Sequence, residues 1–278
     1  MSVLSYQDII RELGKGILFH PLKAGSIKAC DLCLTASEYA YAIGQEQRLI
    51  IQTEQKKDRP GEEQKFFEIP KGETALVWTD EAVYLSNQFR GPLYSVVKQV
   101  SEGLGHIGTR VNPDWTGVLC IALHNVSDKA VRIYVKDVEN PIAHLAIEKL
   151  SSKPSNITHR SSDARLDVLR GRPNSQEITD YFNQKQNTWM KRDTEILKKL
   201  MLESDEYKKL RKGFKDTLIG FFGSSEDTRW NRVSIIGAIL IGGLSALFSG
   251  LTYFNSSHQA PTPNQIPTNT TVTPSSTK

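Results

Sequence analysis

Residues 112–125, NPDWTGVLCIALHN, combine a turn with polar side chains spaced along a strand. Asp114 places one carboxylate at a Pro-Asp turn, and the alternating apolar residues after it predict a strand that ends in Asn. Side chains two residues apart on a strand share a face, so His124 lies on the same face as Ala122. His124 could act as a base near neutral pH, although the plainer interpretation is a half-exposed strand histidine. The segment therefore offers a base but no carboxylate on the strand itself.

Two further groups of reactive side chains give weaker signals. Cys30 and Cys33 stand three residues apart, which on a strand turns them to opposite faces, and no second pair of cysteines exists to complete a metal site. His106 lies in the loop GLGHIG, which could cradle a phosphate but lacks the strand–loop–helix context of such loops, so a turn is the first interpretation.

Composition limits the class of protein. The chain has 278 residues, 38% hydrophobic and 24% charged, a globular balance. A net charge of +4 with no interleaved basic and aromatic patch gives no support for binding a nucleic-acid duplex. Three cysteines give no disulfide framework, which favours a reducing compartment for the main body, and the polar start MSVLSYQDII predicts no signal peptide.

The chain divides into a β-rich head and a helical segment. Residues 1–175 have short Val/Ile/Leu runs split by Gly, Pro and Asn, which predicts a mainly β domain, with one short helix at 6–13. Residues 176–215 are charged and helical, and the seven-residue steps of Leu200, Tyr207 and Phe214 suit a coiled-coil neck. A single helix lying on the β domain fits that segment about equally well.

A membrane segment follows. Residues 233–254 carry no charge, and about 22 residues of helix match a hydrocarbon core of about 30 Å. The alternative, a buried core helix, is disfavoured because the Pro/Thr/Ser/Asn-rich tail at 255–278 has a disordered composition and cannot pack around it. Arg229 and Arg232, in the juxtamembrane segment 216–232, predict a single-pass protein with a cytoplasmic N-terminal domain and an external tail. A stripe of small residues four apart favours helix association: Ser234, Ala238, Gly242, Ala246 and Gly250.

Five motifs, in the same order, resemble the dCTP deaminase and dUTPase superfamily over roughly residues 4–173. They are LSYQDIIRELGKGILFHP, ACDLCL with Asp31 at the family's Asp, IPKGETALVWTDEAVYLS, NPDWTGVLCIALHN and IAHLAI. The resemblance implies a dUTPase-like distorted β barrel that assembles as a homotrimer and binds deoxynucleoside triphosphates between subunits. It also implies Mg²⁺ on a bound triphosphate, and no zinc.

The residues that carry the family's chemistry are largely replaced. The Glu of the family's strand falls on Ala122, and a methyl group cannot transfer a proton. The Arg of the R-S-S phosphate segment falls on Tyr94, which forfeits a charge-assisted contact. Asn112 and Asp114 stand for an Asp and a Gly, and His144 stands for a Gln.

A basic segment at 165–173, RLDVLRGRP, resembles the lid that closes over the phosphates in the deaminases, although a solvated basic linker is about as good an interpretation. The nucleotide contacts that the resemblance leaves are Ser95, Arg110, Asn112, Asp114, Trp115, His144, Arg165 and Arg170.

The sequence thus predicts a membrane-anchored, catalytically inactive deaminase/dUTPase-like protein that binds a nucleotide and couples it to a membrane helix. This architecture is similar to that of bacterial defence effectors. One alternative is an active dCTP deaminase or dUTP pyrophosphatase with relocated groups, of which His124 is the candidate base. Another is a ligand-free structural membrane protein. Ala122 and Tyr94 favour binding over catalysis, and nothing in the sequence separates binding from a structural role.

Overall fold

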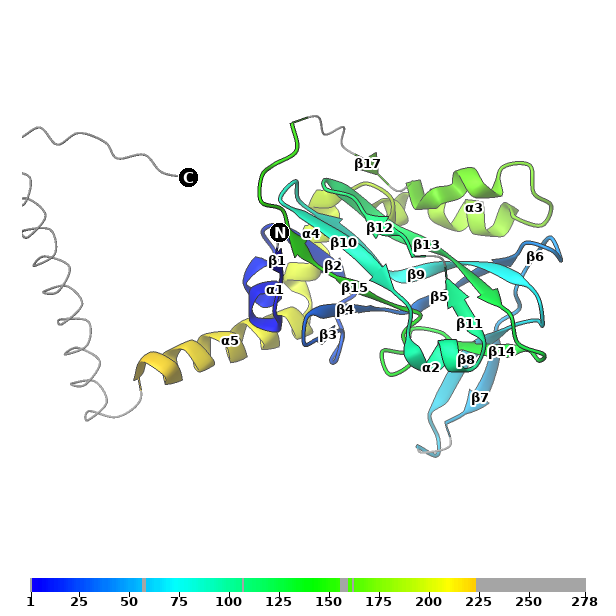
Figure 1. The fold of residues 1–278 in the computed structure, drawn as a ribbon, viewed down its shortest axis with the longest axis horizontal. Coiled ribbons are helices and arrows are strands. Elements are labelled where there is room, and N and C mark those ends of the chain that lie inside the picture. The colour runs from blue at the N-terminus through cyan, green and yellow to red at the C-terminus, as the bar shows by residue number, and fades with distance from the viewer. Residues whose placement is uncertain (1, 57–58, 107, 156–159, 162, 224–278) are drawn as a thin grey trace, which may run out of the picture. The chain divides into compact units, whose positions relative to one another are not determined.

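The computed structural model describes residues 2–56, 59–106, 108–155, 160–161 and 163–223. Met1–Thr217 form one compact unit and Leu218–Lys278 a second, of which only the end of one helix is described. The first unit is mainly β, as expected, and most of its helical residues follow the strands, from Gln176 onward (Figure 1).

The first sheet has the order β1-β16-β10-β15-β4-β3, with β12 paired to β10. This sheet brings the N-terminal residues beside residues 148–149, because β1 pairs with β16. Its strands are β1 (Ser2–Val3), β3 (Ile27–Lys28), β4 (Asp31–Leu34), β10 (Phe89–Tyr94), β12 (Arg110–Val111), β15 (Ala143–Ala146) and β16 (Glu148–Lys149).

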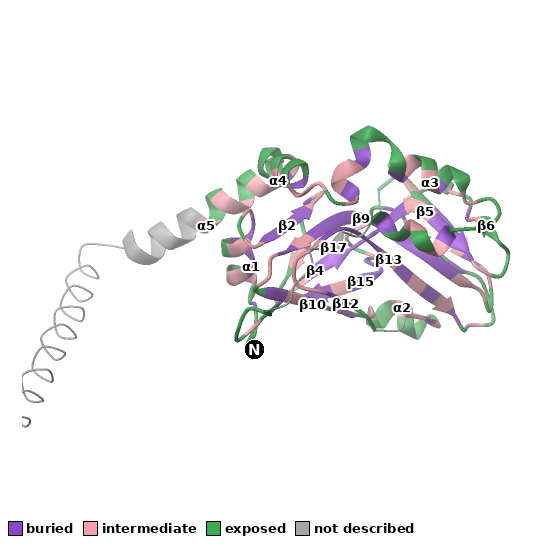
Figure 2. Cartoon of the chain, turned by 90° about the horizontal axis from the view of Figure 1, so that it is seen from above, coloured by how far each residue is buried: buried purple, intermediate pink, exposed green. Residues whose placement is uncertain are grey.

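The second sheet has the order β11-β13-β9-β5-β6, with β2 paired to β9 and β17 paired to β13. Its central strand, β9, is buried along nearly all of its length, because the first sheet lies on one side of it and helices lie on the other (Figure 2). Its strands are β2 (Ile17–His20), β5 (Ala36–Ala42), β6 (Gln47–Arg48), β9 (Thr74–Leu85), β11 (Leu104–His106), β13 (Trp115–Asn125) and β17 (Arg160–Ser161).

A third sheet, β14-β8-β7, is formed by Val131–Tyr134, Glu63–Ile69 and Gln52–Gln55. The strands β8 and β9 follow each other through the turn at Pro70–Gly72, but they do not pair with each other: β8 pairs with β14 and β7. The side chain of Asn125, at the end of β13, holds the end of β8 and the turn before β14 together. Its Nδ2 donates to the carbonyls of Ile69 at 2.8 Å, Pro70 at 3.0 Å and Lys129 at 2.8 Å.

The expected N-terminal helix is α1 (Tyr6–Glu12), and its start has a clear local cause. Ser5 and Asp8 form a capping box, in which each side chain accepts from the backbone N–H of the other residue. The other short helices of the head are α2 (Val97–Ser101) and the 3₁₀ helix η1 (Asp163–Leu169).

The helical segment differs from a continuous neck. It is divided into α3 (Gln176–Asn183), η2 (Lys185–Met190), α4 (Thr194–Glu203) and α5 (Asp205–Gly223). Leu197 and Met201 are fully buried against the head, whereas the expected seam residue Leu200 is only half-buried. The amphipathic pattern therefore serves packing on the β domain through α4, and the segment up to Thr217 belongs to the same compact unit as the sheets.

Within the part of the chain that the structure describes, no helix combines the length and hydropathy needed to cross a membrane. The predicted membrane segment, 233–254, and the tail, 255–278, lie outside the described residues.

Candidate functional site

A pocket of about 460 Å³ opens beside the first sheet, between α2 and the segments around β3, β14 and β15. Its lining includes four basic side chains and two carboxylates, a surplus of two positive charges. The basic residues are Lys28, Lys98, Lys129 and Arg132, and the acidic residues are Glu102 and Glu139. A surface of this kind attracts anions.

Side-chain bonds hold the helical wall of the pocket in place. Lys98 Nζ donates to Asn140 Oδ1 at 2.6 Å, and Gln99 Nε2 donates to the carbonyl of Pro141 at 2.7 Å. Because Asn140 and Pro141 lead into β15, α2 is tied to the strand that carries His144.

The opposite wall is fixed by the third sheet. Arg132 donates to Glu54 Oε2 at 2.8 Å and to Glu68 Oε1 at 3.0 Å, and its guanidinium lies 4.7 Å from the centre of the Phe66 ring. These two carboxylates more than offset the charge of Arg132, so the attraction of the pocket for an anion comes from the three lysines of its lining.

His144 is the predicted nucleotide contact that lines this pocket. On the first sheet it stands directly opposite Cys33 of β4 and Tyr94 of β10, and its Nδ1 lies 3.8 Å from Cys33 Sγ. Burial lowers the pKa of His144 below its ordinary value, and this outweighs the opposing effect of Asp31. The imidazole is therefore neutral at pH 7.

Three other predicted contacts lie near this sheet but not in the pocket lining. Ser95 is half-buried and precedes Val96, the N-cap residue of α2. Arg110 is exposed on β12, opposite Pro92 of β10, and its Nε donates to Asn112 Oδ1 at 3.3 Å. The two side chains therefore bind each other.

The remaining predictions concern β13. By the β13 face we mean the side of this strand that carries Cys120, Ala122 and His124; Trp115, at the start of the strand, pairs with Leu85 of β9, and its indole Nε1 is buried. Cys120 pairs in register with Trp78 of β9, and Ala122 pairs with Leu76. The indole Nε1 of Trp78 donates to the carbonyl of Ala164 in η1, and its ring lies 6.1 Å from that of Phe182 in α3. The β13 face is thus on the side of the sheet that the helices cover (Figure 2).

Arg165, a predicted phosphate contact, belongs to this cover. It binds Asp167 through Nε at 2.9 Å and Nη2 at 3.1 Å. Burial raises the pKa of the Cys120 thiol to about 12, with Arg165 and Asp167 the charged groups that act on it. Arg170 is exposed just after η1, so both arginines lie in the helical layer rather than at the pocket.

Asp114 and His124 lie at opposite ends of the β13 segment, Asp114 in the turn before the strand and His124 near its end. Asp114 takes a positive φ of 58° in the turn before β13, and its charge adds to burial in raising the pKa of Tyr84. The Nδ1 of His124 lies 2.9 Å from Thr74 Oγ1, while its Nε2 is buried and has no hydrogen-bond partner among the described residues. A base at His124 would therefore face the interior. His106 is similar: burial, with His124 as a second cause, lowers its pKa.

Sequence reasoning missed the lysines of the pocket. Lys28, Lys98 and Lys129 come from β3, α2 and the turn before β14, and no short-range spacing relates them. Among the described residues, no group of three or more His, Cys, Asp and Glu side chains is arranged to hold a metal ion.

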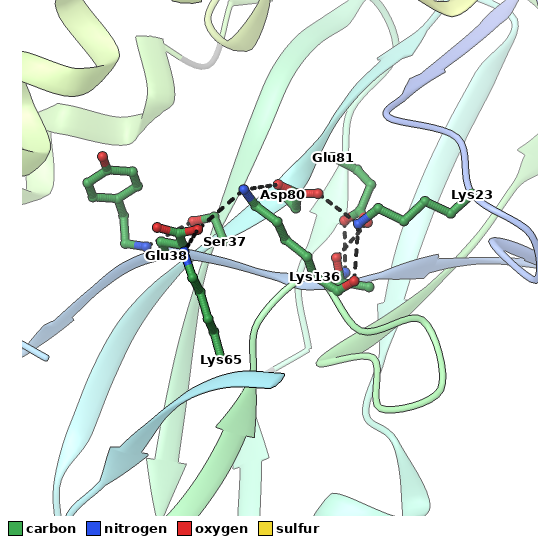
Figure 3. A network of polar contacts seen from close by, with 9 residues as sticks. Lys23, Ser37, Glu38, Lys65, Asp80, Glu81 and Lys136 are labelled. Atoms are coloured by element: carbon green, nitrogen blue, oxygen red, sulfur yellow. Dashed lines mark hydrogen bonds and ion pairs between the residues drawn. The ribbon is translucent and has the colours of Figure 1, made fainter. Parts of the chain in front are cut away.

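A second charged cluster, which shares no residue with the pocket lining, joins strands of the second and third sheets (Figure 3). Asp80 accepts from Lys23 at 2.8 Å and pairs with Lys136 at 3.8 Å, while Glu38 pairs with Lys136 at 3.6 Å and with Lys65 at 3.0 Å. Next to Asp80, the fully buried Glu81 accepts from the backbone N–H of Thr35 at 2.8 Å and from its hydroxyl at 2.6 Å. Because the charges alternate in sign, the cluster stabilises the packing of β5 and β9 against β8 and the segment after β14.

Comparison with known proteins adds a likeness of fold. No protein-family model matches this sequence, and no curated protein is similar to it in sequence. The 2′-deoxycytidine 5′-triphosphate deaminase from Agrobacterium tumefaciens is 10% identical with a TM-score of 0.39, over 57% of this chain and 55% of the deaminase. This chain thus spans about half the length of that deaminase.

Two viral dUTPases are similar to a comparable degree. The native EIAV dUTPase is 17% identical with a TM-score of 0.28, over 40% of this chain and 95% of that enzyme. A variant dUTPase of Staphylococcus bacteriophage 80alpha, with dUpNHpp, is 13% identical with a TM-score of 0.33, over 52% of this chain and 89% of that enzyme. Over part of its length the chain is therefore structurally similar to dUTPases and to a dCTP deaminase, and at these identities the likeness concerns the fold alone.

Proposed function

We propose that this protein binds a deoxynucleoside triphosphate through the pocket beside α2, without turning it over, and that it does so as a membrane-anchored homotrimer. The observation that carries the proposal is the pocket itself, which Lys28, Lys98 and Lys129 line together with His144. Its volume of about 460 Å³ falls within the range of about 300–1,000 Å³ typical of small-molecule sites. A triphosphate supplies the negative charge that such a lining favours.

Absence of turnover follows from the β13 face. Ala122 offers no proton-transferring group, and the nearest replacement, His124, has its Nε2 buried. A general base must reach the proton that it removes, directly or through one water. Binding without chemistry is therefore the simpler expectation. Any Mg²⁺ would come with the triphosphate.

The separation of the predicted contacts supports an oligomer. His144 lies at the pocket beside the first sheet, whereas Arg165 and Arg170 lie in the helical layer on the other side of the second sheet. A single ligand that meets both sets requires two copies of the chain. This agrees with the homotrimer implied by the sequence motifs.

Coupling to a membrane is proposed from the sequence of residues 233–254 and from the way the preceding helices are fixed. The backbone N–H of Phe19 in β2 donates to Met201 Sδ of α4 at 3.3 Å, and Arg211 Nη1 of α5 donates to the carbonyl of Ile10 at 3.3 Å. These bonds join the chain that leads to the membrane segment directly to the head. We place the head in the cytoplasm and the tail outside, with a defence effector as the proposed biological setting.

The test uses the full chain in a mild detergent, with dCTP and dUTP titrated calorimetrically in the presence of Mg²⁺. We expect saturable binding, and no release of pyrophosphate, dUMP or dUTP above a blank without protein. Turnover that His124→Ala abolishes would identify an active enzyme instead. Absence of binding for every deoxynucleotide would leave the ligand-free structural role.

A further inference from the structure

We propose that Cys33 is a positioning residue for the pocket: its thiol donates a hydrogen bond to Nδ1 of His144, which keeps the ring proton on Nε2 and presents an N–H donor to an anionic oxygen of the ligand. The identity of the ligand in this inference rests on the proposed function, whereas the contact between Cys33 and His144 does not depend on it.

The pair is fixed by the backbone of the first sheet. Cys33 of β4 and His144 of β15 stand directly opposite each other in an antiparallel register, and Sγ and Nδ1 are 3.8 Å apart. Cβ atoms of directly opposed residues lie about 4.5–5.5 Å apart, so the contact needs no unusual side-chain conformation. Cys33 is fully buried, whereas His144 is half-buried and lines the pocket. The ring thus has one edge against the core and one toward the pocket.

The protonation states decide which atom donates. Burial raises the pKa of the Cys33 thiol and lowers the pKa of His144, so at neutral pH the pair consists of a thiol and a neutral imidazole. For the thiol, the charge and side-chain hydrogen bond of Lys28 oppose the shift while Glu81 and Asp31 add to it; for the imidazole, Asp31 opposes the shift and Lys28 adds to it, and neither direction is reversed. A thiol is a weak donor and a weak acceptor, whereas a neutral imidazole nitrogen is a good acceptor. We therefore assign the bond as running from Sγ–H to Nδ1.

The bond makes the neutral His144 ring a hydrogen-bond donor in a pocket that is also lined by lysines. With Nδ1 engaged, the proton resides on Nε2, the nitrogen left for the pocket, where Lys28 and Lys98 also lie. An N–H donor with neighbouring ammonium groups suits a phosphoryl or other anionic oxygen, and it cannot serve a ligand atom that must itself donate. Cys33 therefore contributes to ligand selection although it is enclosed.

The first experiment reads the tautomer directly and needs no ligand. Full-length protein labelled with ¹⁵N at histidine is compared with His144→Gln to assign the His144 ring, and long-range proton–nitrogen spectra show which nitrogen carries the proton. We expect Nε2–H in the unaltered protein, a shift toward Nδ1–H in Cys33→Val, and an intermediate state in Cys33→Ser, whose donor sits on a shorter bond. Cys30→Val, at the half-buried neighbouring cysteine, should leave the ring unchanged. A proton on Nδ1 in the unaltered protein, or a tautomer that does not respond to Cys33→Val, would overturn the assignment.

The second experiment tests recognition with inorganic tripolyphosphate, dUTP and deoxyuridine as probes. Cys33→Val should weaken tripolyphosphate and dUTP about three- to tenfold, the effect of one mispositioned hydrogen bond, and leave deoxyuridine unaffected. Equal affinities in both proteins would show that Nε2 does not contact the anion. If the unaltered protein binds none of the probes, the proposed function and the ligand contact both fail, while the tautomer spectra still decide the role of Cys33. Should Cys33→Val not fold, the spectra of the unaltered protein and of Cys33→Ser provide the decision.

Discussion

The pocket beside α2 contains His144, a predicted nucleotide contact, and the β13 face contains His124, the candidate base; these two regions differ in access and in charge. The pocket is open, lined by Lys28, Lys98 and Lys129, and contains His144. The β13 face carries Ala122 and Cys120, and Trp78 beside it is hydrogen-bonded to η1. A ligand can therefore reach the charged groups of the pocket, whereas the side of β13 that carries Cys120 lies under the helices. The proposal of binding without turnover is based on this contrast.

The largest expected effect comes from reversing charge in the pocket. Lys98→Glu with Lys129→Glu should weaken dUTP binding at least about 100-fold, because two charge-assisted contacts are lost and repulsion replaces them. Calorimetric titration of the full chain measures this, with Lys15→Glu, an exposed lysine outside the pocket, as the matched control. If the double variant bound as tightly as the control, the ligand would have to lie elsewhere, and the β13 face would become the alternative.

The contrast between the two regions was only partly accessible from the sequence. The short helix near the N-terminus and the alternating strand at 115–125 depend on neighbouring residues, and both were expected, although the Ser5–Asp8 capping box that starts the helix was not. The three lysines come together through the pairing of strands far apart in the chain, which no local spacing reveals. Along the helical segment, Leu200 and Tyr207 suggested a seam between chains, but Leu197 and Met201 are buried in the chain's own head. An apolar period does not show whether its partner is the same chain or another.

The buried carboxyl of Glu81 should affect the stability of the protein but not its binding of a ligand, because Glu81 is not part of the pocket lining. Glu81 lies on β9 in the core, and burial, the largest cause, raises its pKa from 4.5 to about 7, with Asp80 raising it further and Lys23 and the Thr35 bonds opposing. Because the folded pKa is higher than the unfolded one, this stabilising contribution is complete below about pH 4.5 and is lost as the pH rises toward 7. The difference, 7 − 4.5 = 2.5 pH units, corresponds to at most about 3 kcal/mol.

Chemical unfolding at pH 5 and pH 8 measures this contribution. Glu81→Gln should flatten the decline in the free energy of unfolding, while Glu63→Gln, at an exposed position of β8, should leave it in place. Binding of dUTP at a fixed pH should be the same in both variants. A decline that persists unchanged in Glu81→Gln would mean that another group titrates.

A smaller effect is expected from loosening the cover of the β13 face. Trp78→Phe removes the indole donor and leaves the buried carbonyl of Ala164 without that bond, which should cost about 1–3 kcal/mol of stability. Alkylation of Cys120 reports the opening, because burial keeps its thiol pKa near 12 while the cover is in place. We expect slow labelling in the unaltered protein and faster labelling in Trp78→Phe, with Tyr84→Phe, on the same strand, as a control. Equal rates in all three proteins would mean that η1 does not protect this face.

The central claim, that the ligand binds in the open pocket and not on the β13 face, is tested most directly by hydrogen–deuterium exchange of the full chain with and without dUTP and Mg²⁺. We expect slower exchange on ligand binding in α2 and in the segment from Lys129 to Tyr134, and no change in β13. Slower exchange in η1 is expected as well, because Arg165 and Arg170 of a second copy meet the ligand in the proposed homotrimer. Protection centred on residues 118–124, with α2 unaffected, would contradict the central claim and would place the ligand on the face that lacks the acid.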